Sequence, residues 1–232
     1  MKVAIMQPYL LPYIGYFQLI SAVDLFIVYD NIKYTKKGWI NRNRMLRNGA
    51  DVMFSVPLKG ASDQLDVVDR EIAPEWDGSA LLKQFDGAYR RAPFYAETWP
   101  LMEDVMLNSE RNLFRFLHHS IVGACRHLAI ATDIRISSSI AIDHALSGQD
   151  KVLALCEAVG ATTYVNSPGG ISLYSSDAFS TRGMALRFLH PEPLVYPQFS
   201  GEFVPWLSIV DVLMFNGADA TQHSVTANYR IS

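Results

Sequence analysis

The residues best suited to binding an anion lie in the stretch GWINRNRM, residues 38–45. If this stretch is extended, Arg42 and Arg44 share one face of a strand, and Asn41 and Asn43 share the other. Guanidinium groups bind phosphate or carboxylate through paired hydrogen bonds, so the two arginines predict a clamp for such a group. The alternative is a basic hairpin that faces water and binds nothing.

Further positive charge precedes the two arginines. Lys33, Lys36 and Lys37 lie within residues 31–50, which contain no acidic side chain. These lysines raise the positive potential near the predicted clamp, and we expect Lys33 to contact the substrate.

A second set of candidate residues lies in MQPYLLPYIGYFQLI, residues 6–20. In open α/β sheets, ligands bind beyond the carboxyl ends of the strands, where Gln7, Tyr9 and Tyr13 would lie. Gly15 would open a helix, whose free N–H groups favour an anion. The alternative is a proline-stiffened connection whose tyrosines only pack. Neither a G-x-G-x-x-G motif nor a P-loop motif occurs, so the usual dinucleotide and triphosphate sites are not predicted.

The third candidate region contains a carboxylate in an apolar helix. Asp211 lies in the helix predicted for 205–215, soon after Ser208. A buried carboxylate needs a partner, so we expect Asp211 to pair with a basic residue of the 38–45 stretch or to orient a catalytic group. Exposure on the helix is the alternative. Two more polar residues are candidates for the same cleft, Gln198 and Glu202.

Other kinds of site are not indicated. The sequence has no G-x-S-x-G motif, and its six histidines show no metal-ligand spacing, so no metal site is expected. Cys125 and Cys156 lie in apolar, helix-like contexts, and we expect them to be buried, reduced thiols.

The elements that must position these residues are those of an α/β protein. Residues 3–6 and 25–29 are apolar runs typical of buried strands, and the apolar spacing from Gly15 onward has the period of a helix. This βαβ unit predicts a mostly parallel sheet. The later predicted elements are a strand at 52–56, a strand at 134–138, a helix at 151–159, a strand at 162–166, an SPGG turn, a strand-like run at 184–189 and a final helix at 205–215 that ends near Gly217.

Helical patterns dominate the middle of the chain. They cover about 79–90, 97–108 and 110–130, after a loop predicted for 61–78. We therefore expect one Rossmann-like α/β domain over 1–232, with a helical insertion or cap at 79–130.

Composition and charge exclude several classes of partner. The net charge is -3 and the isoelectric point is about 6.1, so binding to nucleic acid or to anionic membranes is not expected. The first residues lack the apolar run of a signal peptide, and no stretch is long enough to span a membrane. We expect a cytoplasmic protein.

Five separated stretches, in order, resemble the WbqC-like protein family. They are MQPYLLPYIGYFQLI, DLFIVYDNIKYTKKGWINRNRM, FSVPLKG, CEAVGATTYVNSPGG with the following LY, and FVPWLSIVDVLMFNG. The resemblance extends from Met1 to about Gly217. The motif residues that it implies are Gln7, Pro8, Tyr9, Pro12, Gly15, Asp30, Asn41, Arg42, Asn43, Pro57, Ser208 and Asp211.

The resemblance implies an enzyme of O-antigen or lipopolysaccharide biosynthesis. Such an enzyme would be an acyltransferase that moves an acyl or aminoacyl group, such as glycyl, to the amine of a nucleotide sugar. The chemistry needs a base and an oxyanion donor. The expected catalytic residues are Asp30 or Asp211 as base and Asn41, Asn43 or Gln7 as oxyanion donor. The expected substrate-binding residues are Gln7, Tyr9, Tyr13, Gly15, Tyr16, Lys33, Arg42, Arg44 and Ser208.

A more distant similarity links PYIGYFQLI to the H-x-G-H motif of nucleotidyltransferase-like α/β proteins. Tyr13 and Tyr16 occupy the histidine places, and Gly15 matches. Tyrosine cannot supply the positive charge of a histidinium. One alternative is an ATP-dependent adenylating ligase or nucleotidyltransferase-like enzyme, with charge supplied by residues 33–44. A second alternative is a non-catalytic sugar-nucleotide binding protein. The expected co-substrate is an activated acyl donor or ATP, and a homodimer is a candidate assembly.

Overall fold

The computed structural model describes residues 1–60, 64–199 and 201–232. Its centre is a six-stranded sheet in the order β5-β2-β1-β6-β7-β8. All neighbouring strands are parallel except β7 and β8, which are antiparallel. The strands are β1 (Lys2–Met6), β2 (Leu25–Val28), β5 (Asp133–Ile136), β6 (Thr163–Asn166), β7 (Ala185–Pro191) and β8 (Tyr229–Ile231). This arrangement confirms the predicted Rossmann-like α/β class.

The first βαβ unit is formed as predicted. Strand β1 leads through α1 (Ile14–Ser21) to β2, with Val3 beside Leu25 in a parallel register. The chain then builds β5 on the far side of β2 and returns to place β6 on the other side of β1. The strand order therefore reverses between β1 and β6. In open α/β sheets this reversal leaves a crevice at the carboxyl ends of the strands.

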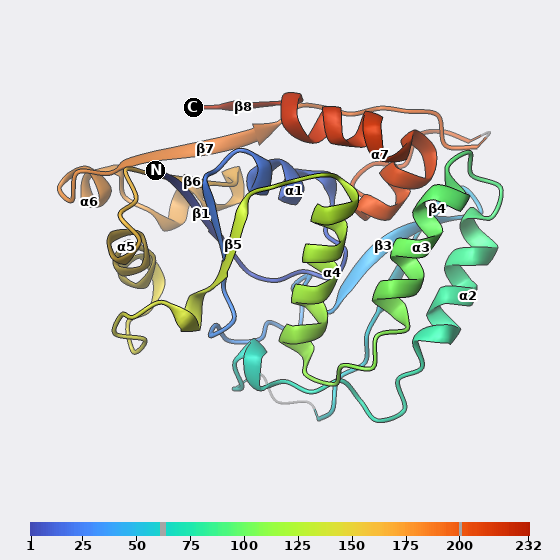
Figure 1. The fold of residues 1–232 in the computed structure, drawn as a ribbon, viewed down its shortest axis with the longest axis horizontal. Coiled ribbons are helices and arrows are strands. Elements are labelled where there is room, and N and C mark those ends of the chain that lie inside the picture. Colours follow the sequence, from blue (N-terminus) through green and yellow to red (C-terminus); the bar gives the residue numbers. More distant parts are fainter. Residues whose placement is uncertain (61–63, 200) are drawn as a thin grey trace.

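Both faces of the sheet are covered (Figure 1). Val3 and Ile5 of β1 pack in one hydrophobic cluster with α5 (Gly148–Ala158), whereas Ala4 packs in the other with α1, α4 (Leu113–His127) and α7 (Ile209–Ala227). Burial on both faces explains why these strands are continuous apolar runs. The other helices are α2 (Gly78–Tyr89), α3 (Tyr95–Met106) and α6 (Ser176–Ser180). The short 3₁₀ turns are η1 (Val67–Asp69), η2 (Ser137–Ser139) and η3 (Pro168–Leu173).

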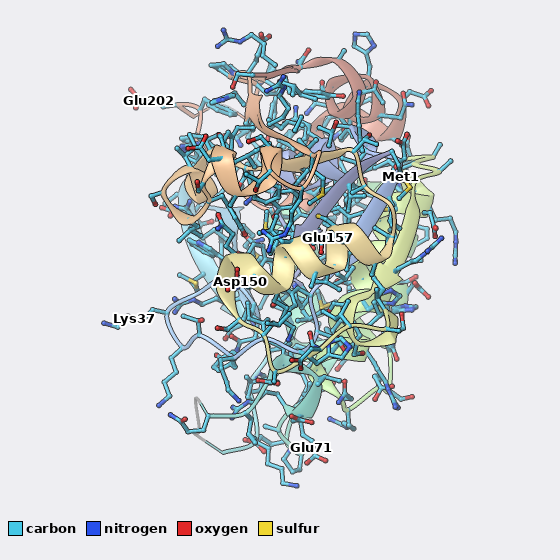
Figure 2. The ribbon with its side chains drawn as sticks, turned by 90° about the vertical axis from the view of Figure 1, so that its left-hand side faces the viewer. Met1, Lys37, Glu71, Asp150, Glu157 and Glu202 are labelled. Atoms are coloured by element: carbon cyan, nitrogen blue, oxygen red, sulfur yellow. The ribbon has the colours of Figure 1, made fainter. Side chains whose placement is uncertain are left out.

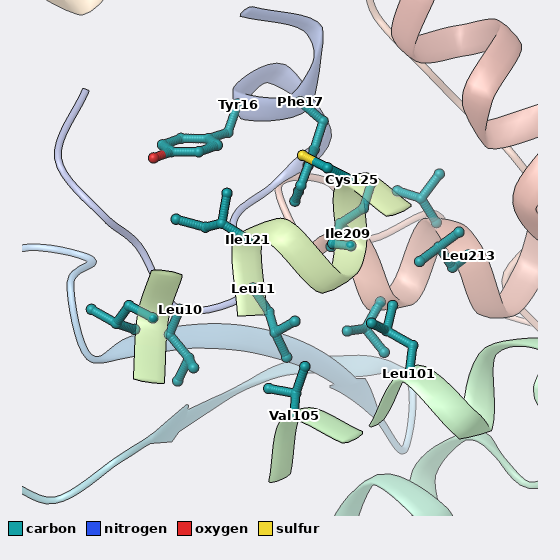
Figure 3. Packing of buried hydrophobic residues seen from close by; sticks show 14 of the residues in the cluster. Leu10, Leu11, Tyr16, Phe17, Leu101, Val105, Ile121, Cys125, Ile209 and Leu213 are labelled. Carbon is teal, nitrogen blue, oxygen red and sulfur yellow. The ribbon is translucent and has the colours of Figure 1, made fainter. Parts of the chain in front are cut away.

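The three middle helices, α2, α3 and α4, continue the main hydrophobic core. Figure 3 shows Leu101 and Val105 of α3 in the same cluster as Ile121 of α4 and Leu11 of the first loop. The middle helices thus share one hydrophobic cluster with the sheet. Whether they also act as a cap stays a prediction.

Residues 42–55 form a separate two-stranded antiparallel sheet. It consists of β3 (Arg42–Arg47) and β4 (Ala50–Ser55). The turn residues Asn48 and Gly49 both have positive φ, which is the geometry that an Asn-Gly hairpin turn provides. The strand begins at Arg42, later than the extended segment expected from Trp39.

The final helix differs from its prediction at both ends. Ser208 caps α7 through a bond from Val210 N to its Oγ, so the helix begins at Ile209 and not at Pro205. Gly217 interrupts the helix with φ 75°, where a Cβ would meet the Phe94 ring, and helical turns then resume as far as Ala227. The predicted loop 61–78 contains η1, and its residues 61–63 lie outside the described residues.

In the part of the chain that the structure describes, none of the helices is both long and apolar enough to cross a bilayer.

Candidate functional site

A large hollow lies at the reversal of strand order. This cleft, called the switch-point cleft, has a volume of about 750 Å³. It is lined by the ends of β1 and β6, by the loop after β2 and by the first turn of α5. Its size and place are those of a small-molecule site in an open α/β sheet.

Lys151 is the most unusual side chain in the cleft. The side chain is only 4% exposed, and its Nζ donates to Asn31 O and to His144 O, both at 3.2 Å. The Tyr29 ring centroid lies 5.3 Å from the same nitrogen. Burial lowers the pKa of Lys151, and the charges of Asp66 and Asp30 oppose this shift. An ammonium has three donors, so after these two bonds to described residues one N–H is left for a ligand.

The first turn of α5 adds to this positive potential. Ser147, Gly148 and Gln149 line the cleft, and Figure 2 shows α5 in front of the sheet with Asp150 near its beginning. Free N–H groups at a helix N-terminus favour an anion, whereas a lysine there is electrostatically unfavourable. Lys151 and the helix end therefore both favour an anion in the cleft.

His144 and Asn31 hold the wall beneath Lys151. The Asn31 Nδ2 lies 2.8 Å from His144 Nδ1, and the His144 Nε2 lies 3.0 Å from Ile140 O. A carbonyl oxygen only accepts, so Nε2 carries the proton and Nδ1 accepts from the amide. Both ring nitrogens are thus bonded to protein groups, and His144 has a positioning role.

The SPGG turn forms the opposite wall. Asn166 ends β6, and its Oδ1 accepts from Ser167 N at 2.8 Å. A Cβ at position 170 would meet the Asn166 carboxamide, so Gly170 allows this close approach. The turn therefore presents small residues and an amide to the cleft.

Lys33 and Asp66 form an ion pair at the edge of the cleft. The Lys33 Nζ lies 3.0 Å from Asp66 Oδ1, and it also donates to Gln64 O at 2.8 Å. Both side chains line the cleft. The structure thus brings the predicted residues Gln7, Tyr9 and Lys33 to one site with the carboxylate of Asp66, which the sequence did not indicate.

A second hollow, the aromatic pocket, adjoins the first. It has a volume of about 280 Å³ and is lined by Tyr9, Pro12, Tyr13, Trp39, Asn43, Arg44 and Trp206. Because Tyr9 lines both hollows, they meet at this side chain. Three of the stretches that carry the family resemblance, separated in sequence, therefore converge on this pocket.

The tyrosine wall of the aromatic pocket depends on a glycine. The Tyr13 ring occupies the space that a Cβ at Gly15 would need, and its centroid lies 6.0 Å from that of Trp206. Tyr16 points away, because it is buried and its hydroxyl donates to Gln7 O at 3.0 Å. Gly15 therefore positions Tyr13, and Tyr16 supports the loop.

The two arginines flank the opposite wall. The Cζ of Arg44 lies 5.4 Å from the Trp39 ring centroid, and that of Arg42 lies 5.9 Å away. Arg44 also donates to Asp51 Oδ2 at 3.0 Å and to Trp206 O at 3.2 Å, whereas Arg42 Nε donates to Gly38 O at 2.8 Å. Arg44 lines the aromatic pocket, and Arg42 supports Trp39. Neither arginine is among the residues that line the switch-point cleft.

Asn43 and Ser208 hold the first loop in place, whereas Asn41 bonds to residues outside that loop. Asn43 Nδ2 donates to Leu10 O and Leu11 O at 3.0 and 2.8 Å, and Ser208 Oγ donates to Leu11 O at 2.7 Å. Asn41 Nδ2 donates to Val56 O at 2.8 Å, and its Oδ1 accepts from the Tyr34 hydroxyl. Their polar atoms are thus bonded to the protein, and the oxyanion role proposed for the asparagines stays a prediction.

The two predicted bases are buried. Asp30 accepts from Ser137 Oγ at 2.7 Å and from Ser138 N and Oγ at 2.9 and 2.6 Å, which ties β2 to the loop after β5. The base role of Asp30 stays a prediction, because these bonds do not test it.

Asp211 has different partners from those expected. It accepts from the hydroxyls of Tyr89 and Tyr196 at 2.9 and 2.7 Å and from Gln198 Nε2 at 2.6 Å. Of the two expected roles, pairing with a basic residue of 38–45 was therefore wrong, because phenol and amide donors satisfy this carboxylate, and orientation of a catalytic group stays a prediction. Burial raises the pKa of Asp211, and the three hydrogen bonds oppose the shift.

Several cleft residues were not predicted, namely Tyr29, Asn31, Asp66, His144, Lys151, Asn166 and Tyr174. One signal was available, since Lys151 is a cation in the first turn of an apolar helix. The cysteine prediction is confirmed, because Cys125 and Cys156 are free and buried, and burial raises the pKa of both thiols to about 12. Among the described residues, no cluster with the composition of a metal site was found.

Comparison with known proteins identifies the family. The sequence profile of the WbqC-like protein family matches residues 7–223. An uncharacterized protein of Mycobacterium tuberculosis is 30% identical over 226 residues, which is 96% of each chain. No solved structure matches the chain. The match extends from the first loop through the cleft and the aromatic pocket to α7, and the chain therefore belongs to the WbqC-like protein family.

Proposed function

We propose that this protein transfers an acyl or aminoacyl group to the amine of a nucleotide-linked amino sugar in the cytoplasm. Family membership suggests a role in surface-polysaccharide biosynthesis. The observation that carries the substrate class is Lys151, a buried ammonium at the first turn of α5, facing a cleft at the reversal of strand order. Such a cleft favours a phosphate-bearing nucleotide.

The proposed reaction joins two substrates at the cleft. The sugar amine attacks the carbonyl carbon of the acyl donor, the new C–N bond forms, and the carbonyl electron pair moves to oxygen. When the intermediate collapses, the bond to the leaving group breaks and the amine loses a proton. The site must therefore take up a proton and stabilise an oxyanion.

The contacts of the cleft favour a different base from those expected. The oxygens of Asp30 and Asp211 bind buried protein donors, whereas Asp66 lines the cleft beside Lys33. We assign uptake of the proton to Asp66, the phosphates to the remaining N–H of Lys151 and the oxyanion to a cleft amide. Asn166 supplies an amide on the opposite wall.

The binding step is tested by calorimetric titration with UDP- and dTDP-linked amino sugars. Replacing Lys151 with Met should weaken binding at least tenfold, because one charged hydrogen bond to phosphate contributes on the order of 1.5–3 kcal/mol. Lys83→Met is the matched control, since Lys83 is exposed on α2. Unchanged affinity in Lys151→Met would exclude the cleft as the nucleotide site.

The transfer step is tested by mass spectrometry of the sugar nucleotide after incubation with acyl donors. Amide formation that depends on a preactivated donor supports the proposal, and its loss in Asp66→Asn supports the assigned base.

An ATP-dependent ligase is the second candidate, because the same anion-binding helix end suits a triphosphate. It predicts pyrophosphate release that requires both ATP and a carboxylate. Tight binding of a sugar nucleotide without turnover on any donor would instead indicate a non-catalytic binding protein.

A further inference from the structure

We propose that the aromatic pocket binds the nucleobase of the sugar nucleotide, while the phosphates occupy the switch-point cleft. This inference deepens the proposed function and rests on it for the identity of the complete ligand. It assigns a subsite to Trp39, Trp206, Tyr13 and Arg44, which are separate from Lys151 and α5.

The pocket exposes large aromatic rings to solvent. Trp206 is 65% exposed and Trp39 is 40% exposed, and both line the same hollow of about 280 Å³. Indole rings that stay partly exposed next to a concave surface are suited to stacking against a flat ring. Every nucleobase has such a π-face, and stacking on aromatic side chains is a general mode of base binding.

The backbone at Trp206 supports a functional reason for this exposure. Its φ is 61°, in the left-handed region that bulky residues rarely adopt. The strained backbone holds an indole in solvent, which contributes little to folding. A residue kept in an unfavourable conformation by its surroundings indicates a binding role.

Arg44 supplies the polar part of the subsite. Its Nη1 and Nη2 each make one bond to protein, to Asp51 and to Trp206 O. Each of these nitrogens carries a second N–H. Carbonyl oxygens at the edge of uracil, thymine or guanine are acceptors for such donors. The pocket therefore combines ring faces with in-plane donors, which is the chemistry of a carbonyl-bearing base.

The position of Tyr9 allows one ligand to occupy both hollows. Tyr9 lines the cleft and the aromatic pocket, and its hydroxyl donates to Gln7 Oε1 at 3.3 Å. A nucleoside diphosphate is a linear molecule with a base at one end and phosphates at the other. Its base and phosphates would lie on the two sides of Tyr9.

The test is titration of intrinsic tryptophan fluorescence with uridine, thymidine and guanosine, which carry no phosphate. At least one of them should quench the emission with saturation. Trp206→Ala should weaken this binding about tenfold, the size typical of losing a base–aromatic stack. Trp206→Phe should retain most of the affinity. The matched control is Trp99→Phe, because Trp99 lies on α3 beside Tyr95 and lines neither hollow.

The arms separate this inference from the proposed function. Lys151→Met should weaken the binding of sugar nucleotides and leave the binding of nucleosides unchanged. Nucleoside binding without sugar-nucleotide binding would support the subsite and overturn the proposed function. Sugar-nucleotide binding that is unaffected by Trp206→Ala, or binding of glucosamine 1-phosphate but of none of the nucleosides, would overturn the nucleobase subsite. Circular dichroism of Trp206→Ala verifies its fold.

Discussion

The hydroxyl of Tyr89 donates to Asp211 Oδ1 at 2.9 Å and accepts from Leu46 N at 2.8 Å. This phenol therefore joins α2, β3 and α7 through one buried oxygen. The Asp211 carboxylate also accepts hydrogen bonds from Tyr196 and Gln198. The network therefore anchors the chain on both sides of Trp206, at Gln198 and at Asp211.

We predict that Asp211→Ala lowers the free energy of unfolding by roughly 2–4 kcal/mol, because it leaves buried donors without an acceptor. Urea denaturation measures this change. Tyr89→Phe, which removes one hydroxyl, should cost less. Equal stability of Asp211→Ala and the native protein would show that the buried network contributes nothing.

The pH dependence of stability should show the raised pKa of Asp211. The folded state binds this proton at a higher pH than the unfolded state, whose ordinary value is 3.8. Stability from this group therefore falls as pH rises from about 3.8 to the folded pKa, and is constant above it. Subtracting the profile of Asp211→Asn isolates this slope, and a difference that rises with pH would contradict it.

Gly15→Ala should disrupt the aromatic pocket. The added methyl would meet the Tyr13 ring, so we expect a loss of stability of roughly 1–3 kcal/mol and weaker nucleoside quenching. The matched control is Gly87→Ala in α2, where a Cβ meets nothing within 4 Å. That variant should gain roughly 0.5–1 kcal/mol. A loss of stability in both would point to a general helix effect.

Trp206 offers a test that separates folding from binding. Trp206→Gly should be more stable than Trp206→Ala by about 1 kcal/mol, because glycine adopts a positive φ without strain. Both should bind nucleosides equally poorly. If alanine were the more stable of the two, the strain at this position would be absent in solution.

Lys151 should give binding a characteristic pH profile. Burial lowers its pKa below the ordinary 10.5, so it loses its proton earlier than an exposed lysine. As the pH rises from the folded pKa of Lys151 toward 10.5, the affinity of the protein for a sugar nucleotide should fall. The free energy of unfolding should rise over the same pH interval, because the unfolded state holds more protons there. Calorimetry of the native protein and of Lys151→Met measures the pH profiles of affinity and of stability. The same pH dependence in both proteins would contradict the role of Lys151.

Much of the fold could be predicted from local patterns. The runs at 3–6 and 25–29 are strands because both of their faces are buried, so a continuous apolar pattern survives. The end of the chain was harder to predict. Gly217 ended the predicted helix, but the Phe94 ring fills its open side and the helix resumes beyond it.

The candidate site could be predicted only in part. Gln7 and Tyr9 follow a recognisable strand, so their place at a carboxyl end could be inferred from sequence. Lys151 and Asn166 line the same cleft only because of the order of the strands, which local periodicity does not encode. Asp30 and Asp211 have the residue type of a base, and only the three-dimensional contacts reveal that serines and tyrosines surround them.

The N-terminus of α7 has a consequence for how the molecule assembles. Ser208 N donates to Arg44 O, Ile209 N donates to Pro12 O, and Ser208 Oγ donates to Leu11 O. Contacts so distant in sequence form late, because the chain must close a long loop first. During synthesis the first loop must wait for the last part of the polypeptide before it takes its final shape. A nascent chain released before residue 206 could pair its early strands, yet it would lack one wall of the aromatic pocket.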